Sequence, residues 1–299
     1  MNTAIYLDVL EAYLKAKRFS ATTLVHKRLY GSRFLAFLHQ QELSVSDCSY
    51  TDLLGYVKQL KSAGRSAHNI NTHLVAVRQL YASQIALEHL DHNPALHLHV
   101  KGRVQRLPHD LLSYEQLEAL YRYPPGSTNP LEAIRDQVLL GLCIYQGVTR
   151  QDLTLLQTDH INLKTGELTL VGHRKLARRK LALQSSQILV LQEYVSVVRP
   201  ELQLQSMGDK GCRLFFTYSD QPDISSVLRD LLKRLKASYP YVLRLQQLRS
   251  SVIRHWIKTV PIRQVQYWSG HRSISSTERY RLEDLEDLQE GLSKYHPLQ

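Results

Sequence analysis

A proline break one third of the way along the chain limits its fold more than any other feature. Asn93-Pro94 ends a long helical stretch, because the residue before a proline disfavours helical backbone angles. Residues 93–108 contain three cationic side chains, a glycine and no acid. Such a composition is typical of an extended segment between domains. The sequence therefore predicts a domain over residues 1–92, a basic linker over 93–108 and a second domain over 109–299.

The first 92 residues have the apolar spacing of consecutive helices. The pattern predicts one helix near residues 5–14, and the Ser20–Thr23 segment separates it from the next. Three more are predicted over residues 24–40, 51–61 and 66–89. Basic side chains outnumber acidic ones here, which is expected of a helical domain that binds DNA. The alternative is that each of these cations simply lies on a solvated helix face.

The second part of the chain has a mixed pattern. Ser113 and Gln116 form a capping box that opens a helix, and Asn129-Pro130 opens another. The further predicted elements are helices over 151–158, 187–198, 224–237 and 245–258, and strands over 168–171 and 180–183. The expected fold class is mainly α with a small β-sheet or hairpin.

The end of the chain predicts one more helix. Leucines recur at 282, 285, 288 and 292 among acidic residues, so an amphipathic helix is expected over residues 282–292. A helix this short must bury its apolar stripe against something. The stripe either packs within the same chain or docks onto a neighbouring subunit.

The composition excludes several classes of protein. The net charge of +11 makes a polyanion the natural partner. Three cysteines, far apart in the sequence, argue against a disulfide framework and against zinc, and they suit a reducing cytoplasm. The N-terminus does not resemble a signal peptide, and no apolar run reaches the ~20 residues of a membrane span. We therefore expect a cytoplasmic protein without a metal, a cofactor or a membrane anchor.

The residues most suggestive of chemistry lie near the C-terminus. Tyr280 follows Gly270-His271 at a spacing of nine residues from the histidine, and Arg249 lies upstream in an amphipathic stretch. Cleaving a phosphodiester without a metal needs a nucleophile, donors for the phosphoryl oxygens and an acid for the leaving oxygen. Tyrosine suits the first role, arginine the second, and histidine or lysine the third.

These segments resemble those of the tyrosine recombinase, or phage integrase, family. The Gly-His step and Tyr280 match the motif in which that family carries its nucleophile. Three upstream segments match in position: residues 146–153 match Thr-Gly-x-Arg-x-x-Glu-Leu, residues 246–249 match His-x-Leu-Arg, and residues 171–183 match the hairpin that carries a catalytic lysine. The resemblance covers nearly the whole chain and implies a helical core-binding domain followed by a tyrosine-recombinase catalytic domain.

Two family positions hold other residues in this chain. Thr149 stands where the first catalytic arginine is expected, and Arg150 follows it. One residue turns a helical side chain by about 100°, so Arg150 substitutes only if the backbone shifts. Gln246 replaces the histidine of the His-x-Leu-Arg segment. In the hairpin, Arg174 or Lys175 takes the place of the catalytic lysine.

The resemblance implies a role for each candidate catalytic residue. Tyr280 attacks the phosphate and gives a 3′-phosphotyrosine and a free 5′-hydroxyl. Arg249, with Arg150, holds the phosphoryl oxygens, and His271 assists in positioning or proton transfer. Lys175 protonates the leaving oxygen, since an arginine with a pKa above ~12 is a poor acid.

The remaining cations of these segments are predicted to bind DNA. In the hairpin they are Arg174, Arg178, Arg179 and Lys180, and in the linker they are Lys101 and Arg103. Together with Lys175, the hairpin has five cations within seven residues, and these repel one another unless an anionic partner is present. The alternative is a solvated turn. His173 and His255 have no evident partner in the sequence and are interpreted as structural.

Three functions remain open. The first is a site-specific recombinase from a mobile element or integrated phage, which acts on double-stranded DNA as a tetramer on two sites. In it, Arg150, Arg174 or a partner's residue compensates for Thr149. The second is a catalytically impaired DNA-binding accessory protein, whose binding Tyr280→Phe leaves untouched. The third is a type IB topoisomerase, which would relax supercoils as a monomer without site preference.

Overall fold

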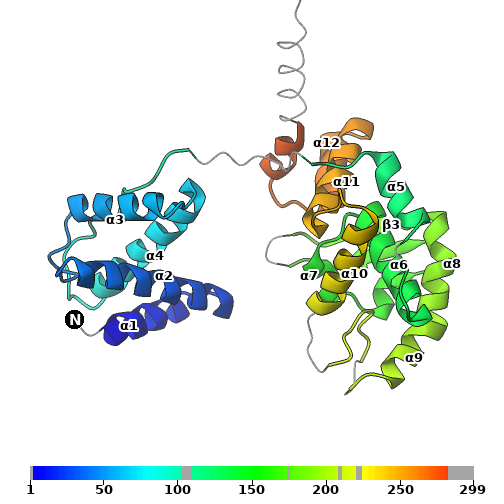
Figure 1. The fold of residues 1–299 in the computed structure, drawn as a ribbon, viewed down its shortest axis with the longest axis horizontal. Coiled ribbons are helices and arrows are strands. Elements are labelled where there is room, and N and C mark those ends of the chain that lie inside the picture. Colours follow the sequence, from blue (N-terminus) through cyan, green and yellow to red (C-terminus); the bar gives the residue numbers. More distant parts are fainter. Residues whose placement is uncertain are drawn as a thin grey trace, which may run out of the picture. The chain divides into compact units, whose positions relative to one another are not determined.

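The chain folds into two compact units, residues 1–105 and 106–299 (Figure 1). The computed structural model describes residues 3–102, 110–124, 126–173, 176–207, 211–219 and 224–281. Helices dominate both units and a small sheet lies in the second, so the predicted fold class is confirmed. The helix predicted over residues 282–292 lies outside the described residues.

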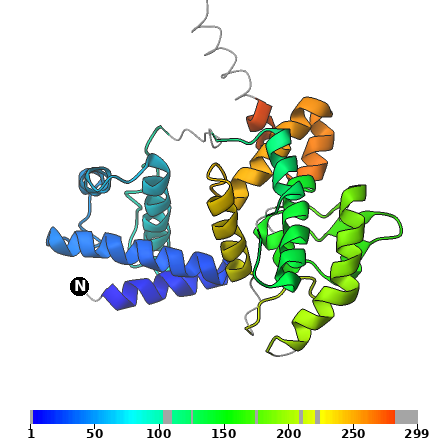
Figure 2. The same cartoon turned by 45° about the vertical axis from the view of Figure 1, so that its right-hand side comes forward.

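The first unit consists of the four helices that the apolar spacing predicted. They are α1 (Thr3–Ala16), α2 (Ala21–Gln40), α3 (Tyr50–Ser62) and α4 (Ala67–Ile85). Ser20, Ser49 and Ser66 cap the last three, each accepting a hydrogen bond from a backbone N–H three residues later. Helix α2 packs against α1 and α4, and α3 packs against α4 (Figure 2).

The core of this unit lies between α2 and α4. Phe34, Leu35 and Leu38 of α2 and Leu74 of α4 are completely buried. Burying each such side chain contributes about 1.5–3 kcal/mol. Tyr81 is also buried, and its hydroxyl donates a 3.0 Å hydrogen bond to the carbonyl of Val45, so its polar end is satisfied.

The first part of the segment predicted as a linker packs onto this unit. Ala95 and Leu98 are buried in its core. Asn71 on α4 donates a 2.8 Å hydrogen bond to the carbonyl of Val100 and accepts a 2.9 Å bond from its N–H. Residues 93–100 are therefore held against α4, because two apolar side chains and an asparagine bridge fix them. Residues 103–108 lie outside the described residues.

The second unit is built around α6 (Pro130–Tyr145). The helix packs against α5 (Tyr114–Arg122), α8 (Ser185–Glu193) and α11 (Leu245–Thr259) (Figure 1). The other helices are α7 (Arg150–Leu155), α9 (Arg199–Leu204), α10 (Ser225–Ser238) and α12 (Ile262–Ser269), with a 3-10 turn over Thr158–His160 and a π-helical turn over Tyr194–Val198. The predicted capping box of α5 is present.

A three-stranded antiparallel sheet borders α12. Its strands are β1 (Ile161–Asn162), β2 (Glu167–Leu170) and β3 (Arg179–Ala182), in that order. Side chains alternate between the two faces of a strand, so Arg179 shares the buried face of β3 with Leu181. The sequence predicted β2 and β3 and missed β1, which has two residues. No helix within the described part of the chain is long and apolar enough to cross a membrane.

Candidate active site

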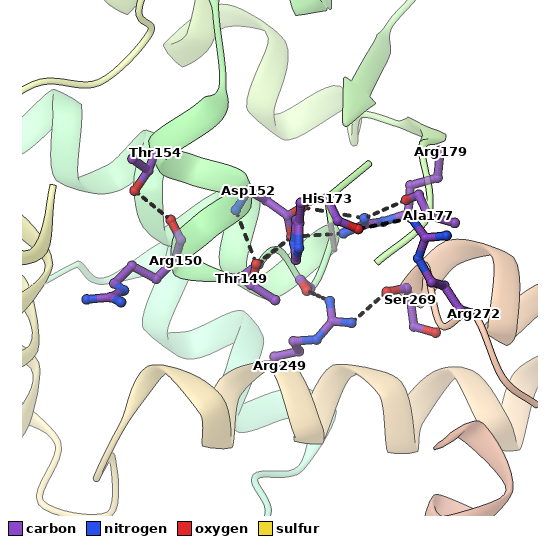
Figure 3. A network of polar contacts seen from close by, with 11 residues as sticks. Thr149, Arg150, Asp152, Thr154, His173, Ala177, Arg179, Arg249, Ser269 and Arg272 are labelled. Atoms are coloured by element: carbon purple, nitrogen blue, oxygen red, sulfur yellow. Dashed lines mark hydrogen bonds and ion pairs between the residues drawn. The ribbon is translucent and has the colours of Figure 1, made fainter. Parts of the chain in front are cut away.

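Arg249 lies at the centre of the predicted site and joins three segments. It is 4% exposed on α11. Its guanidinium donates hydrogen bonds to the carbonyl of Gly147, just before α7, and, at 2.6 Å, to the carbonyl of Ser269 at the end of α12 (Figure 3). Burial, and then the charge of Arg179, lower its pKa to about 10. Arg249 therefore stays cationic at neutral pH.

His271 and Tyr280 lie together beyond the end of α12. Their rings are stacked, with 6.2 Å between centroids and 17° between planes. Nδ1 of His271 is 2.9 Å from the hydroxyl of Thr277, which fixes the orientation of the imidazole. Tyr280 is 4% exposed and packs against Ile253 of α11 and Val265 of α12. The structure thus brings the predicted nucleophile and histidine into contact.

The electrostatic surroundings keep the His271 side chain neutral. Burial, and then the charges of Arg249, Arg279 and Arg179, lower its pKa to about 4. An imidazole that is neutral near pH 7 supplies no positive charge. This arrangement argues against direct neutralisation of a phosphate by His271 in the free protein.

Gly270 connects His271 to the hairpin that follows β2. The glycine ends α12 with a φ of +72°, in the left-handed region that glycine adopts readily. Its carbonyl accepts a 2.8 Å hydrogen bond from the N–H of Ala177, and Leu176 pairs with His271 as an isolated antiparallel bridge. The hairpin is therefore fixed against the motif that carries the histidine and tyrosine.

Thr149 has a capping role in place of the arginine expected at its position. Its hydroxyl donates a 2.8 Å hydrogen bond to Oδ2 of Asp152, and its backbone N–H donates another at 2.9 Å. The same hydroxyl accepts a bond from the N–H of Asp152, which completes a capping box at the start of α7. The short side chain of Thr149 is thereby turned toward Asp152 (Figure 3).

Arg179 is buried beside the site, although the sequence analysis assigned it to DNA. Its side chain is fully buried, and Nη2 lies 3.0 Å from Oδ2 of Asp152. Burial alone would raise the pKa of the Asp152 carboxyl, but Arg179 and the bonds from Thr149 hold it below its usual range. Arg179 therefore lies on the buried face of β3 and is paired with Asp152, and its predicted contact with DNA stays a prediction.

His173 is the site residue that sequence reasoning missed. Its Nε2 lies 3.7 Å from Oδ1 of Asp152, and its side chain is 7% exposed. The carbonyl of His173 accepts a 3.1 Å hydrogen bond from Arg272, the residue after His271 (Figure 3). His173, which was interpreted as structural, therefore lies beside Asp152 and Arg179. In contrast, His255 stacks on Tyr114 with 4.4 Å between ring centroids.

Arg150 and Gln246 do not join these residues. Arg150 extends away from Arg249 in Figure 3, and its guanidinium donates a 2.6 Å hydrogen bond to the hydroxyl of Ser225 at the start of α10. The one-residue offset therefore places Arg150 on another side of α7. Gln246 is exposed and contacts Ser250 on its own helix at 3.5 Å.

The other predicted DNA contacts lie partly on the surface and partly outside the described residues. Arg178, Lys180 and Lys101 are exposed. Lys180 forms a 3.7 Å ion pair with Glu167 on the neighbouring strand, and both side chains are about half exposed or more. The predicted roles of Arg103, Arg174 and Lys175 remain predictions, since these three residues are not described.

Within the described ranges, no group of three or more His, Cys, Asp or Glu side chains has an arrangement that could hold a metal ion. The donors that converge here are guanidinium, imidazole, hydroxyl and backbone groups.

Known proteins with similar sequences are named tyrosine recombinases. Tyrosine recombinase XerD of Staphylococcus saprophyticus is 23% identical over 300 residues, covering 97% of this chain and 98% of the relative. Tyrosine recombinase XerC of Roseiflexus castenholzii is 25% identical over 284 residues, covering 91% and 88%.

Solved structures share the fold. The XerH site-specific recombinase bound to a palindromic difH substrate has a TM-score of 0.73 at 18% identity, covering 94% of this chain and 82% of that one. The Tn1549 transposon integrase with a circular intermediate DNA has a TM-score of 0.66 at 15% identity, covering 93% and 99%. The model of the phage integrase family matches residues 110–286, which is more than half of the chain. This protein therefore belongs to the phage integrase family.

Proposed function

We propose that this protein is a site-specific DNA recombinase that cuts and rejoins DNA through a 3′-phosphotyrosine on Tyr280. The observation that carries the proposal is the convergence of Arg249, from α11, with His271 and Tyr280, from the segment that follows α12. Its curated relatives XerD and XerC, named tyrosine recombinases, align over more than nine tenths of the chain.

The cleavage step balances with side chains alone. The hydroxyl oxygen of Tyr280 forms a bond to phosphorus, and the bond from phosphorus to the 5′-oxygen breaks. The proton of Tyr280 passes to His271, whose imidazole is neutral in the free protein and becomes a better acceptor when the negative charge of the phosphate offsets the nearby arginines. The leaving 5′-oxygen takes a proton from Lys175. In the reverse direction, a 5′-hydroxyl attacks the phosphotyrosine and rejoins the strand, so the bond energy is conserved.

Arg249 supplies charge to the phosphoryl oxygens. A guanidinium carries five N–H donors, and the bonds to Gly147 and Ser269 use two of them. Those two carbonyls hold the planar group in a fixed orientation, and the remaining donors match the bidentate geometry of a phosphate. We leave Arg150 out of this contact because it extends toward α10.

A second cationic surface, on α2 and α4 of the first unit, suits the DNA backbone. Burial, and then the charge of Arg78, lower the pKa of Lys27 to about 8. Within the described residues, no carboxylate forms an ion pair with Lys27, Arg33, Arg65 or Arg78. Close cations without an acid repel one another until an anion binds, and the phosphates of DNA would relieve that repulsion.

The assembly follows from the chemistry of exchange. Exchange between two duplexes requires that four strands are each cut and rejoined once, and each chain provides one nucleophile. We therefore assign a tetramer on two DNA sites, with the leucine stripe of residues 282–292 as the candidate subunit contact. We also propose a mobile element as its setting, which the fold shared with the Tn1549 transposon integrase supports.

Covalent trapping tests this function. Duplexes that bind Tyr280→Phe protein are first selected from a random library, so that the site is found without cleavage. Each is then nicked next to candidate scissile phosphates, so that a short 5′ fragment diffuses away and rejoining fails. We expect wild type and the matched control Tyr267→Phe, which alters an exposed tyrosine of α12, to form a denaturation-resistant adduct. Specific binding without an adduct at every nick position would instead support a DNA-binding accessory factor.

A further inference from the structure

Thr277 connects the histidine of the site to the helix that carries the nucleophile. Residues 275–281 are helical, and Thr277 and Tyr280 lie three residues apart in that helix. Side chains at this spacing are neighbours on one face of a helix. Thr277 is completely buried, and its hydroxyl lies 2.9 Å from Nδ1 of His271. The helix face that presents Tyr280 therefore also holds the imidazole.

The backbone of His271 is fixed separately from its ring. Its N–H donates a 3.1 Å hydrogen bond to the carbonyl of Gln266, and its carbonyl accepts a 3.2 Å bond from the side-chain amide of the same glutamine. Gln266 belongs to α12, so that helix determines where the chain passes at His271. The contact with Thr277 determines how the ring is turned and what its nitrogens can do.

Nε2 is the ring nitrogen of His271 that remains for chemistry. Among the described residues, the ring forms a hydrogen bond to Thr277 alone, through Nδ1. Burial, and then the nearby arginines, lower the pKa of His271 to about 4, so one of its two nitrogens carries a proton and the other does not. The hydrogen bond at one nitrogen sets which of them is protonated. The ring is stacked on that of Tyr280 with 6.2 Å between centroids, so this choice is made beside the nucleophile.

We propose that Thr277 is a positioning residue that accepts a hydrogen bond from Nδ1–H of His271 and thereby leaves Nε2 unprotonated to receive the proton of Tyr280. In the cleavage step the O–H bond of Tyr280 breaks, its oxygen bonds to phosphorus, and the proton bonds to Nε2. Both ring nitrogens are then donors, and Nδ1 keeps its acceptor in Thr277. With the opposite polarity, in which the hydroxyl donates to Nδ1, Nε2 would already hold a proton. The inference rests on the proposed recombinase function.

The first test observes the position of the proton in the free protein. NMR spectra of protein with nitrogen-labelled histidine rings distinguish a protonated ring nitrogen from a bare one, and His271→Gln identifies the signals of this residue. We expect a protonated Nδ1 and a bare Nε2 in wild type and in Thr277→Ser, which keeps the hydroxyl. Thr277→Val keeps the shape but removes the acceptor, so the proton should shift toward Nε2. A protonated Nε2 in wild type, or no change in Thr277→Val, would overturn the proposal.

The second test is a double-mutant cycle in single-turnover cleavage of nicked DNA. Thr277→Val should cleave on the order of 10–10²-fold more slowly than wild type, which is part of the contribution of a positioned base. Thr277→Ser should retain most of the rate. In a His271→Gln background, Thr277→Val should cause no further loss, because no imidazole is left to position. The matched control is Ser275→Ala, which removes an exposed hydroxyl of the same helix and should cleave as wild type does.

The wild-type reaction separates this inference from the function on which it rests. If wild type forms no adduct on Tyr280, the recombinase proposal fails and this inference fails with it. If wild type forms the adduct but the losses from Thr277→Val and His271→Gln multiply in the double variant, Thr277 acts independently of His271. That result would overturn the positioning role and leave the recombinase function intact.

Discussion

The two sides of the active site hold their cations in different ways. On the α11–α12 side, Arg249 donates to backbone carbonyls, which carry no net charge. On the α7–β3 side, Arg179 and His173 both lie against the buried carboxylate of Asp152. The first arrangement leaves a cation available to a substrate, and the second uses the charge of Arg179 to neutralise an acid.

This difference predicts different consequences for the loss of each cation. Removing Arg249 leaves two carbonyls without one of their donors, which costs less in folding than an unpaired buried charge and much in reaction rate. Removing Arg179 leaves a buried carboxylate without its main counter-charge, which is costly for folding itself. Substitutions on the two sides should therefore separate activity from stability.

The largest expected effect on folding is that of Arg179→Met. Because Asp152 would stay buried without its 3.0 Å ion pair, we expect the free energy of unfolding to fall by about 3–5 kcal/mol. The matched control is Arg178→Ala, since Arg178 is exposed one residue earlier. Urea denaturation of both proteins measures the difference. Equal stability of the two variants would show that the Asp152 pair does not hold this side together.

Arg249→Ala should show the opposite profile. Loss of a charged donor to the transition state typically lowers a rate by about 10²–10³-fold, and we expect that loss in single-turnover cleavage. The decrease in unfolding free energy should be smaller than for Arg179→Met. Arg249→Lys should not restore the rate, because an ammonium group cannot reproduce the planar fork. A fully active lysine variant would contradict the bidentate role.

Gly270→Ala tests the junction between the two sides. A β-carbon at residue 270 would lie 2.7 Å from Nη1 of Arg179, and the φ of +72° is unfavourable for alanine. Left-handed backbone costs a non-glycine residue about 1–2 kcal/mol. We expect a loss of stability of that size or more, measured by thermal unfolding. Gly126→Ala is the control, since a β-carbon there meets nothing within 4 Å. Equal thermal stability of the two variants would show that a β-carbon at residue 270 does not collide with the Arg179 side chain.

The smallest expected effect concerns Lys27 in the first unit, which forms no ion pair with a carboxylate of the described residues. Lys27 has a pKa of about 8, so it is mostly protonated at pH 7, and contact with a phosphate should raise that pKa. Raising the pH from 7 to 9 deprotonates it in the unbound protein, so DNA affinity should fall by at most about tenfold. Lys27→Met should bind DNA with a flatter pH dependence, whereas the exposed control Lys58→Met should behave as wild type. The measurement is DNA affinity as a function of pH. If both variants keep the full pH dependence of wild type, Lys27 is not the group that titrates.

Much of this fold could be predicted from periodicity and caps. Helices α2, α3, α4 and α5 begin where serine caps mark them, because a cap satisfies backbone donors that the helix leaves open. Helix α12 was missed because it has eight residues and follows a proline directly. The strand pair was predicted, but β1 is too short for any alternation to show.

The site could be predicted on one side only. Tyr280, His271 and Arg249 follow motif spacing, and the structure places all three around the end of α12. The roles of Arg179 and His173 depend on which face of a strand or turn meets Asp152, and spacing does not reveal that partner. One signal was available for Arg179: in the alternating strand 179–182 it shares a face with Leu181, which predicts burial.

The central claim is that Tyr280 is the nucleophile, although Tyr267 on α12 is far more exposed, at 47% against 4%. The most direct measurement digests the trapped protein–DNA adduct and identifies by mass spectrometry the peptide that carries the nucleotide 3′-phosphate. We predict that the modified residue is Tyr280, which must then move out of its contact with α11 and α12 when DNA binds. A 3′-phosphate on Tyr267, or on any residue other than Tyr280, would contradict the account.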